Sequence, residues 1–230
     1  MRTILFSLAL SFGLLTGPAF AQEPTSPAAA TAAPVSEASL SAARDLTTAM
    51  LVDSGILPTA IQHVWNQYLP QLRQQYGSLP GVSEPRRQAA VAFLETVPAI
   101  LNEEVNRVLP RIINDAAPDI AAVFTEQELT DIATFMRDAR TRSLLTRMVT
   151  GNVAGLTNEE LAFANEFSQS PAGRAMDAKG NQLTAALDRA MQSASQELQT
   201  TLMRRMFQGL CGALEEECPA PLRTMANAPT

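Results

Sequence analysis

Apolar residues recur at every third or fourth position through most of the chain. One stripe consists of Leu94, Val97, Leu101, Val105, Val108 and Ile112, and a second of Leu183, Leu187, Ala190, Ala194, Leu198 and Leu202. This spacing places the side chains on one face of a helix. No segment shows the sustained period-two alternation of a strand. The pattern therefore predicts an all-α protein, folded as a helical bundle with almost no sheet.

Proline and glycine residues divide this pattern into separate helices, because glycine favours helix ends and proline favours the first helical turn. Pro98 and Pro110 are expected to kink or break the longest apolar stretch. The helices predicted in this way span residues of about 40–52, 58–77, 84–114, 119–124 and 171–208.

The first 21 residues have a different pattern. Met1-Arg2 gives a positive start, residues 4–15 form an apolar run, and Ala19-Phe20-Ala21 fits the small-x-small cleavage pattern. The run is shorter than the roughly 20 apolar residues that cross a bilayer. We expect a secretory signal peptide over residues 1–21, cleaved between Ala21 and Gln22. We expect no spanning membrane segment after its removal, and export to the periplasm or to the outside of the cell.

Residues 22–39 combine alanine with three prolines and almost no large apolar side chain. Such a segment buries too little surface to offset its ordering entropy, so we expect a flexible tether. Residues 219–230 have a similar composition and are expected to form a flexible tail. The folded part is then predicted as a single α-helical domain over residues 40–218.

Two segments that lie 32 residues apart share a pattern. Each begins with a threonine N-cap and a glutamate at the third helical position, which is a capping box, and continues to a phenylalanine and an arginine. The matched pairs are Thr125 and Thr157, Glu128 and Glu160, Phe135 and Phe167, and Arg142 and Arg174. We interpret residues 125–150 and 157–180 as a duplicated helix–corner–helix unit, since repeats of this length are usually helix pairs.

The second copy continues as Ser170-Pro171-Ala172-Gly173-Arg174. The string Thr-x-x-Glu-Leu, then Phe, then Ser-Pro-x-Gly-Arg resembles the bacterial family called domain of unknown function 2059 over residues 157–179, and more weakly over residues 125–148. The family usually has Tyr where this chain has Ser168, so any contact of that Tyr is absent here. The first copy has Asp138-Ala139-Arg140-Thr141 in place of the Ser-Pro-x-Gly string. The resemblance implies no activity, because none is assigned to the family.

The motif has a structural interpretation. Ser170 can cap the helix that Pro171 begins, and Gly173 lets another segment approach closely because it lacks a side chain. Phe167 is then a core anchor at the end of the preceding helix. We favour a joint between helices over a catalytic site.

Composition and charge narrow the function classes. The chain carries 17 Lys and Arg against 23 Asp and Glu, for a net charge of −6, with no long basic block. This balance argues against nucleic acid as the main partner. A single histidine excludes sites with two imidazoles, and two cysteines exclude a four-thiolate zinc site. Adjacent glutamates point about 100° apart on a helix, so we interpret them as solvated faces. We expect no cofactor, no metal and no catalytic residue.

Cys211 and Cys218 lie near the end of the last predicted helix. A continuous helix would separate them by about 10 Å, which exceeds disulfide reach, but Gly212 offers a helix stop. Since export would place both thiols in an oxidising compartment, we predict a disulfide that closes a small loop. A redox-catalytic pair is the alternative, although such pairs usually show a Cys-x-x-Cys spacing.

Three functions remain open from the sequence. The leading one is a non-enzymatic periplasmic or envelope interaction module, which binds another protein or itself through packed helices. The second is a carrier of a small apolar ligand in the bundle core, for which nine methionines and nine phenylalanines are suited. The third is an enzyme with carboxylates or serines that only folding brings together.

Overall fold

The computed structural model describes residues 35–227, so the predicted signal peptide and the Ala21–Gln22 cleavage site lie outside the described residues. Within this range the chain forms helices joined by short turns and contains no strand, which confirms the all-α prediction. The α-helices are α2 (Glu37–Thr48), α3 (Ile56–Gly77), α4 (Glu84–Leu94), α5 (Val97–Val123), α6 (Glu126–Arg137), α7 (Ala139–Val149), α8 (Asn158–Gln169), α9 (Pro171–Leu214) and α10 (Ala220–Ala226). Short helical turns are η1 (Ala49–Asp53), η2 (Val153–Gly155) and η3 (Glu215–Glu217).

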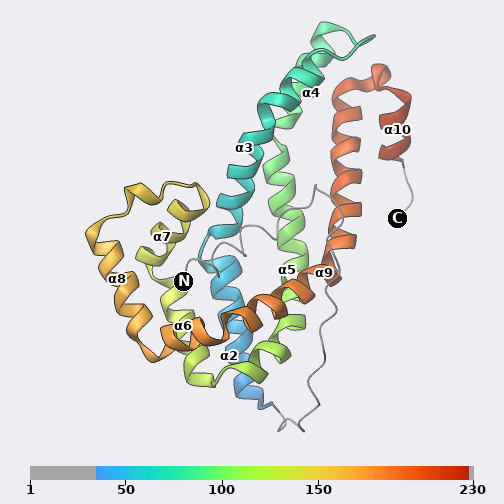
Figure 1. Cartoon of the computed structure of the whole chain (residues 1–230). Coiled ribbons are helices and arrows are strands. Elements are labelled where there is room, and N and C mark those ends of the chain that lie inside the picture. The colour runs from blue at the N-terminus through green and yellow to red at the C-terminus, as the bar shows by residue number, and fades with distance from the viewer. Residues whose placement is uncertain (1–34, 228–230) are drawn as a thin grey trace.

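A first apolar cluster fills the space between α2, the start of α3, α5, α6 and the first part of α9. Its fully buried members include Leu46, Ile120, Leu129, Ile132, Leu183 and Leu187. Burial of each such side chain contributes roughly 1.5–3 kcal/mol to stability. This cluster is therefore the main source of stability for the part of the molecule drawn in the lower half of Figure 1.

A second apolar cluster lies between the end of α3, α4, the start of α5 and the end of α9. Leu94, Leu210 and Leu214 are fully buried there. The indole N–H of Trp65, on α3, donates a hydrogen bond to the Leu94 carbonyl oxygen at 3.1 Å, which satisfies its one polar group. Leu101 packs against both clusters, so α5 joins them.

Helix α9 serves both clusters, and it changes direction between its orange first part and its red last part (Figure 1). The stretch from Gln192 to Thr200 contains no proline or glycine. Instead, the hydroxyls of Ser193, Ser195 and Thr200 donate to carbonyls of the same helix at 2.8–2.9 Å. Such bonds are known to bend helices.

The predicted tether is wrong for its last residues. Helix α2 begins at Glu37, and Ser36 caps it by accepting a hydrogen bond from the Ser39 N–H at 3.0 Å. Pro34 is the last proline before the helix, and the next apolar residues, Val35 and Leu40, pack against the first cluster. A cap and an apolar contact therefore start the helix earlier than composition suggested. The tether residues before Val35 lie outside the described range.

Of the two outcomes expected at Pro110, a kink or a break, the break is wrong, because α5 continues through Pro110 and Pro118. The chain breaks earlier, at Glu95 and Thr96. Pro110 lies on the exposed face of α5, while the opposite face is buried along the helix. That burial offsets the hydrogen bond that a proline removes.

The end of the chain differs from the prediction as well. Helix α9 runs to Leu214, through Gly212, and the predicted flexible tail contains α10. Leu222 packs against the second cluster, and the side-chain amide of Gln208 donates to the Ala226 carbonyl oxygen at 3.2 Å. These contacts order a segment whose composition alone suggested disorder. Residues 228–230 lie outside the described range.

Candidate functional site

Helices α8 and α9 meet at one extended residue, Ser170 (φ −70°, ψ 161°). Its hydroxyl accepts a hydrogen bond from the Gly173 N–H at 3.0 Å and donates one to the Phe167 carbonyl at 2.6 Å. Pro171 follows in the first helical turn, where its missing N–H does no harm. A Cβ on Gly173 would lie 1.9 Å from the Phe167 carbonyl oxygen, so the end of α8 leaves no room for a side chain. These residues form a tight joint.

The corner between α6 and α7 is Asp138 (φ −61°, ψ 137°), whose carboxylate accepts a hydrogen bond from the Arg140 N–H at 2.8 Å. At the position that matches Gly173 this corner has Thr141, which is 1% exposed. The Thr141 hydroxyl donates to the Phe135 carbonyl at 2.5 Å. A hydroxyl therefore binds the corresponding carbonyl in both corners, although it comes from a different position in each.

Both helix pairs begin with a complete capping box. The Thr125 N–H donates to the Glu128 carboxylate at 2.8 Å, and the Thr157 N–H donates to the Glu160 carboxylate at 2.8 Å. Glu128 also accepts a hydrogen bond from Lys179, on α9, at 2.7 Å. Burial raises the pKa of Glu128, but the bonds from Lys179 and Thr125 outweigh it and lower that pKa. The first box therefore ties α6 to α9.

The second box ties α8 to α7. Glu160 is 7% exposed and accepts hydrogen bonds from the Ser143 hydroxyl at 2.5 Å and the Arg147 Nε at 3.3 Å. The bond from Ser143, followed by that from the Thr157 N–H, lowers the pKa of Glu160 to about 2. The carboxylate is therefore ionised near neutral pH, and it has no proton to donate as a general acid.

Three phenylalanines stack where the two helix pairs meet. The ring centroids of Phe135 and Phe167 lie 3.6 Å apart with planes 12° apart, and those of Phe135 and Phe163 lie 5.2 Å apart with planes 21° apart. The Arg140 guanidinium lies 3.8 Å from the Phe163 ring centroid. Sequence reasoning missed Phe163, although it precedes Phe167 by one helical turn and so shares its face.

An open groove of about 510 Å³ runs along α7. Its polar lining residues are Arg142, Ser143, Thr146, Arg147, Thr150 and Asn152. Arg142 Nη2 donates to the backbone carbonyl of Asp53 at 2.9 Å, whereas the matched Arg174 donates to the Gln169 carbonyl in its own helix pair. Sequence reasoning singled out Arg142 only as a repeat position. The polar residues spaced by three and four along α7 were the available signal for the groove.

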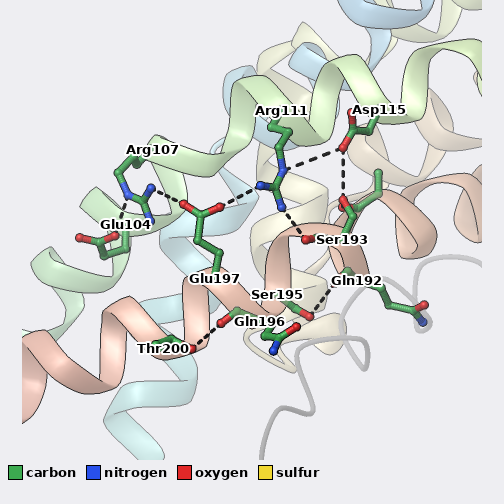
Figure 2. A network of polar contacts seen from close by, with 11 residues as sticks. Glu104, Arg107, Arg111, Asp115, Gln192, Ser193, Ser195, Gln196, Glu197 and Thr200 are labelled. Carbon is green, nitrogen blue, oxygen red and sulfur yellow. Dashed lines mark hydrogen bonds and ion pairs between the residues drawn. The ribbon is translucent and has the colours of Figure 1, made fainter. Parts of the chain in front are cut away.

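A polar network lies across the α5–α9 interface, between the two apolar clusters (Figure 2). Glu104 is 4% exposed and accepts hydrogen bonds from Arg107 Nε at 2.9 Å and Arg205 Nη1 at 2.6 Å. Burial raises the pKa of Glu104, but the bonds from Arg205 and Arg107 outweigh it and lower that pKa. Glu104 is thus a buried, paired carboxylate.

The same network reaches the bend of α9 (Figure 2). Glu197 accepts hydrogen bonds from Arg107 at 2.6 Å and from Arg111 at 2.8 Å. Arg111 also donates to the Ser193 backbone carbonyl, and the Ser193 hydroxyl donates to Asp115 at 3.2 Å. Because arginines of α5 hold both a side chain and a backbone carbonyl of α9, the network fixes the register of the two helices at the bend.

The cysteine pair lies at the far end of α9. The Sγ atoms of Cys211 and Cys218 are 2.06 Å apart, at disulfide distance. The intervening turn carries Glu215, which pairs with Arg86, and Glu217, which accepts a hydrogen bond from the Ser83 N–H. The loop between the cysteines therefore contacts the connection between α3 and α4.

No group of three or more His, Cys, Asp or Glu side chains within residues 35–227 is placed to hold a metal ion. The low-pKa carboxylates Glu160 and Asp138 are each held by a basic side chain and a hydroxyl or backbone donor. Within residues 35–227, Glu160 links α8 to α7, and Asp138 caps the start of α7. Among residues 35–227, every helix is too short or too polar to be a candidate membrane span.

Over residues 35–227 the chain is therefore all-helical, with two apolar clusters, two capped helix–corner–helix segments and an open groove along α7. The family model described as "Uncharacterized protein conserved in bacteria (DUF2059)" matches residues 153–201, which contain η2, α8 and the first part of α9. This is the family that the sequence motif resembles, and the match covers less than half of the chain. No curated protein and no solved structure gives a significant match.

Proposed function

We propose that the chain is an exported, non-enzymatic module of the bacterial envelope that binds another protein. We place it in the periplasm. The observation that carries the proposal is the surface around the α7 groove. Val153 on η2 is 53% exposed and Leu161 on α8 is 50% exposed, and both belong to the segment that the family model matches. Val153 follows Asn152, which lines the groove, and Leu161 follows Glu160, which accepts hydrogen bonds from Ser143 and Arg147 of the lining. Protein-binding sites combine such exposed apolar side chains with polar groups.

The alternatives have less support. A carrier of a small apolar ligand needs an apolar pocket, whereas the α7 groove is lined by arginines, hydroxyls and an amide. An enzyme needs convergent groups that are ready for proton transfer or attack. Glu104 and Glu160 instead have lowered pKa values and are paired with arginines. Self-association stays an alternative form of the interaction proposal.

The two helix–corner–helix segments support a duplicated unit, which we include in the proposal. Helices α6 and α8 each span 12 residues, follow a capping box and end at a single extended corner residue. Phe135 and Phe167, at matched positions, stack on each other. An alignment of relatives in which the two segments are no more alike than unrelated helix pairs would contradict the duplication.

A site-specific crosslinking experiment tests the interaction. A photoreactive amino acid replaces Leu161 in the chain expressed in its own cells, and a matched variant carries it at Gln75, an exposed residue at the end of α3. We expect a crosslinked product from the Leu161 variant but not from the Gln75 variant. We also expect the protein in the periplasmic fraction, with Gln22 as its first residue. A bare monomer with no product at Leu161, or retention in the cytoplasm, would refute the proposal. A product of twice the chain mass would indicate self-association.

A further inference from the structure

The turn that follows α9 holds one residue in a rare backbone conformation. Glu215 has φ 49° and ψ −123°, and within residues 35–227 it is the one residue other than glycine with a positive φ. A side chain clashes with the backbone in this region, which glycine mainly occupies. Such a residue lowers the population of its turn by a factor of roughly 5–150. The surrounding structure must therefore hold Glu215 in place.

The disulfide is the strongest of the constraints on this turn. It joins Cys211, one helical turn before Glu215, to Cys218, three residues after it, and so fixes both ends of the turn. Cys218 is 5% exposed and packs in the second apolar cluster. The Glu215 N–H donates to the Cys211 carbonyl oxygen, so α9 continues up to the strained residue without a glycine to end it.

The same turn fastens the connection between α3 and α4, which lies beside the red end of α9 in Figure 1. Glu217 accepts a hydrogen bond from the Ser83 N–H at 2.5 Å, and Glu215 pairs with Arg86. The side chains of Arg86 and Glu215 are 36% and 56% exposed. An exposed ion pair favours its contact by a factor of about 5 or less, which is at most the smallest cost expected at Glu215. The covalent link is therefore needed to keep the turn in this conformation.

We propose that the Cys211–Cys218 disulfide is a site of reversible thiol–disulfide exchange, and that its reduction by a dithiol releases η3 from the α3–α4 connection. The sulfur of Cys211 is the one attacked, because Cys211 is half-buried whereas Cys218 is buried. A thiolate of the dithiol bonds to that sulfur, the disulfide breaks, and Cys218 leaves as a thiolate that takes up a proton.

The second thiolate of the dithiol then attacks the mixed disulfide, and Cys211 leaves and takes up a proton. The two cysteines have gained two electrons and two protons, and the dithiol has become a disulfide. A dithiol is therefore the co-reactant, and the exchange is reversed when a disulfide reagent oxidises the two cysteines again.

Reduction removes the constraint that holds Glu215. The residue can then return to a negative φ, which redirects the chain after it and moves Glu217 away from Ser83. The same change affects α10, because Arg223 donates to the carbonyl oxygen of Glu216 in η3 at 3.2 Å. The oxidised chain thus has a fixed surface at this end of α9, and the reduced chain has a loosened one.

The Ser83 N–H reports on this contact directly, because its acceptor is the Glu217 carboxylate. Amide hydrogen exchange is followed by NMR in the chain from Gln22 onward, before and after treatment with dithiothreitol. The matched control is the Thr125 N–H, which donates to the Glu128 carboxylate at 2.8 Å. We expect exchange at Ser83 to become about 3–10-fold faster on reduction, as for loss of one exposed charge-assisted bond, and exchange at Thr125 to change less than about twofold. An unchanged rate at Ser83, or an equal change at both amides, would overturn the inference.

A pair of variants separates the backbone strain from the ion pair. Glu215→Gln and Glu215→Gly both remove the charge that pairs with Arg86, but only glycine removes the cost of the positive φ. The equilibrium of each variant with a dithiothreitol buffer is measured by counting free thiols. We expect the equilibrium constant for reduction to be about 3–30-fold lower in Glu215→Gly than in Glu215→Gln, after allowance for the freedom that glycine gains in the released turn. Equal constants in the two variants would contradict the inference, as would a disulfide that dithiothreitol does not open in the folded chain.

Discussion

Gly173→Ala is expected to be strongly destabilising, although the substitution usually favours a helix. Gly173 lies in the first turn of α9, where its new Cβ would lie 1.9 Å from the Phe167 carbonyl oxygen and 2.8 Å from the Ser168 Cα. These are backbone atoms and cannot move as a side chain would. An ordinary contact between carbon and oxygen is about 3.3 Å, so the ends of α8 and α9 must separate by more than about 1 Å.

The magnitude follows from two opposing effects. Forcing an extra methyl group into a packed site costs about 1–3 kcal/mol and sometimes more. Alanine returns up to about 1 kcal/mol through helix propensity. Because the overlap here is with backbone, we expect a net loss of about 2–3 kcal/mol in the free energy of unfolding. For a chain of this size that corresponds to a fall of about 4–12 °C in Tm.

Thermal unfolding followed by circular dichroism measures the effect, with two glycines of the same helix as controls. A Cβ added at Gly212 would have no atom within 4 Å, so Gly212→Ala should raise stability by about 0.5–1 kcal/mol. Gly209 faces the Phe93 ring, which can move, so Gly209→Ala should fall between the two. If Gly173→Ala is as stable as Gly212→Ala, the account of the α8–α9 joint is wrong.

Three further predictions concern stability. Cys211→Ser should cost about 2.5 kcal/mol in urea unfolding, as expected for a loop closed across seven residues, and reductant should leave the variant unchanged. The pKa of Glu160 is lowered to about 2 from 4.5, so its stabilisation is complete above pH 4.5 and is lost as the pH falls towards 2. Glu160→Gln should therefore flatten the acid side of a Tm–pH curve, whereas Glu159→Gln should not. Glu104→Gln should lower the free energy of unfolding by about 1–3 kcal/mol, because two arginines lose a buried charged acceptor. The variant Glu103→Gln, at the exposed neighbour, should lower it by less than about 1 kcal/mol. Equal losses in the two variants would contradict the role of burial.

Features that depend on neighbouring residues could be predicted from the sequence. Helices α6, α8 and α9 begin directly after Thr125, Thr157 and Ser170, because a cap and the backbone N–H it binds lie within three residues of each other. The all-α class follows from the apolar period for the same reason. The local argument failed at Pro110. The helix does not break there, because burial of the opposite face of α5 offsets the hydrogen bond that the proline removes.

Features that depend on distant partners could not be predicted. The Glu104–Arg205 contact joins residues 101 positions apart. The apolar period places Glu104, three residues after Leu101 and four before Val108, on the buried face of α5, but it does not identify the distant arginine that pairs with it. The polar residues along one face of α7 can be recognised in the sequence, but whether they line a groove depends on how the neighbouring helices pack around α7. The order of α10 depends on contacts with Gln208 and the second apolar cluster.

The bend in α9 sets a limit on what the family match describes. The matched segment ends at Thr201, near the bend of α9 (Figure 1), and the residues that α9 contributes to the second apolar cluster lie beyond that point. The family model therefore describes the α8–α9 joint, two of the three stacked phenylalanines and the first part of α9, whereas Phe135 lies outside it. The end of α9, α10 and the cysteine pair lie outside the matched residues. The structure on the two sides of the bend is therefore best compared with other proteins separately.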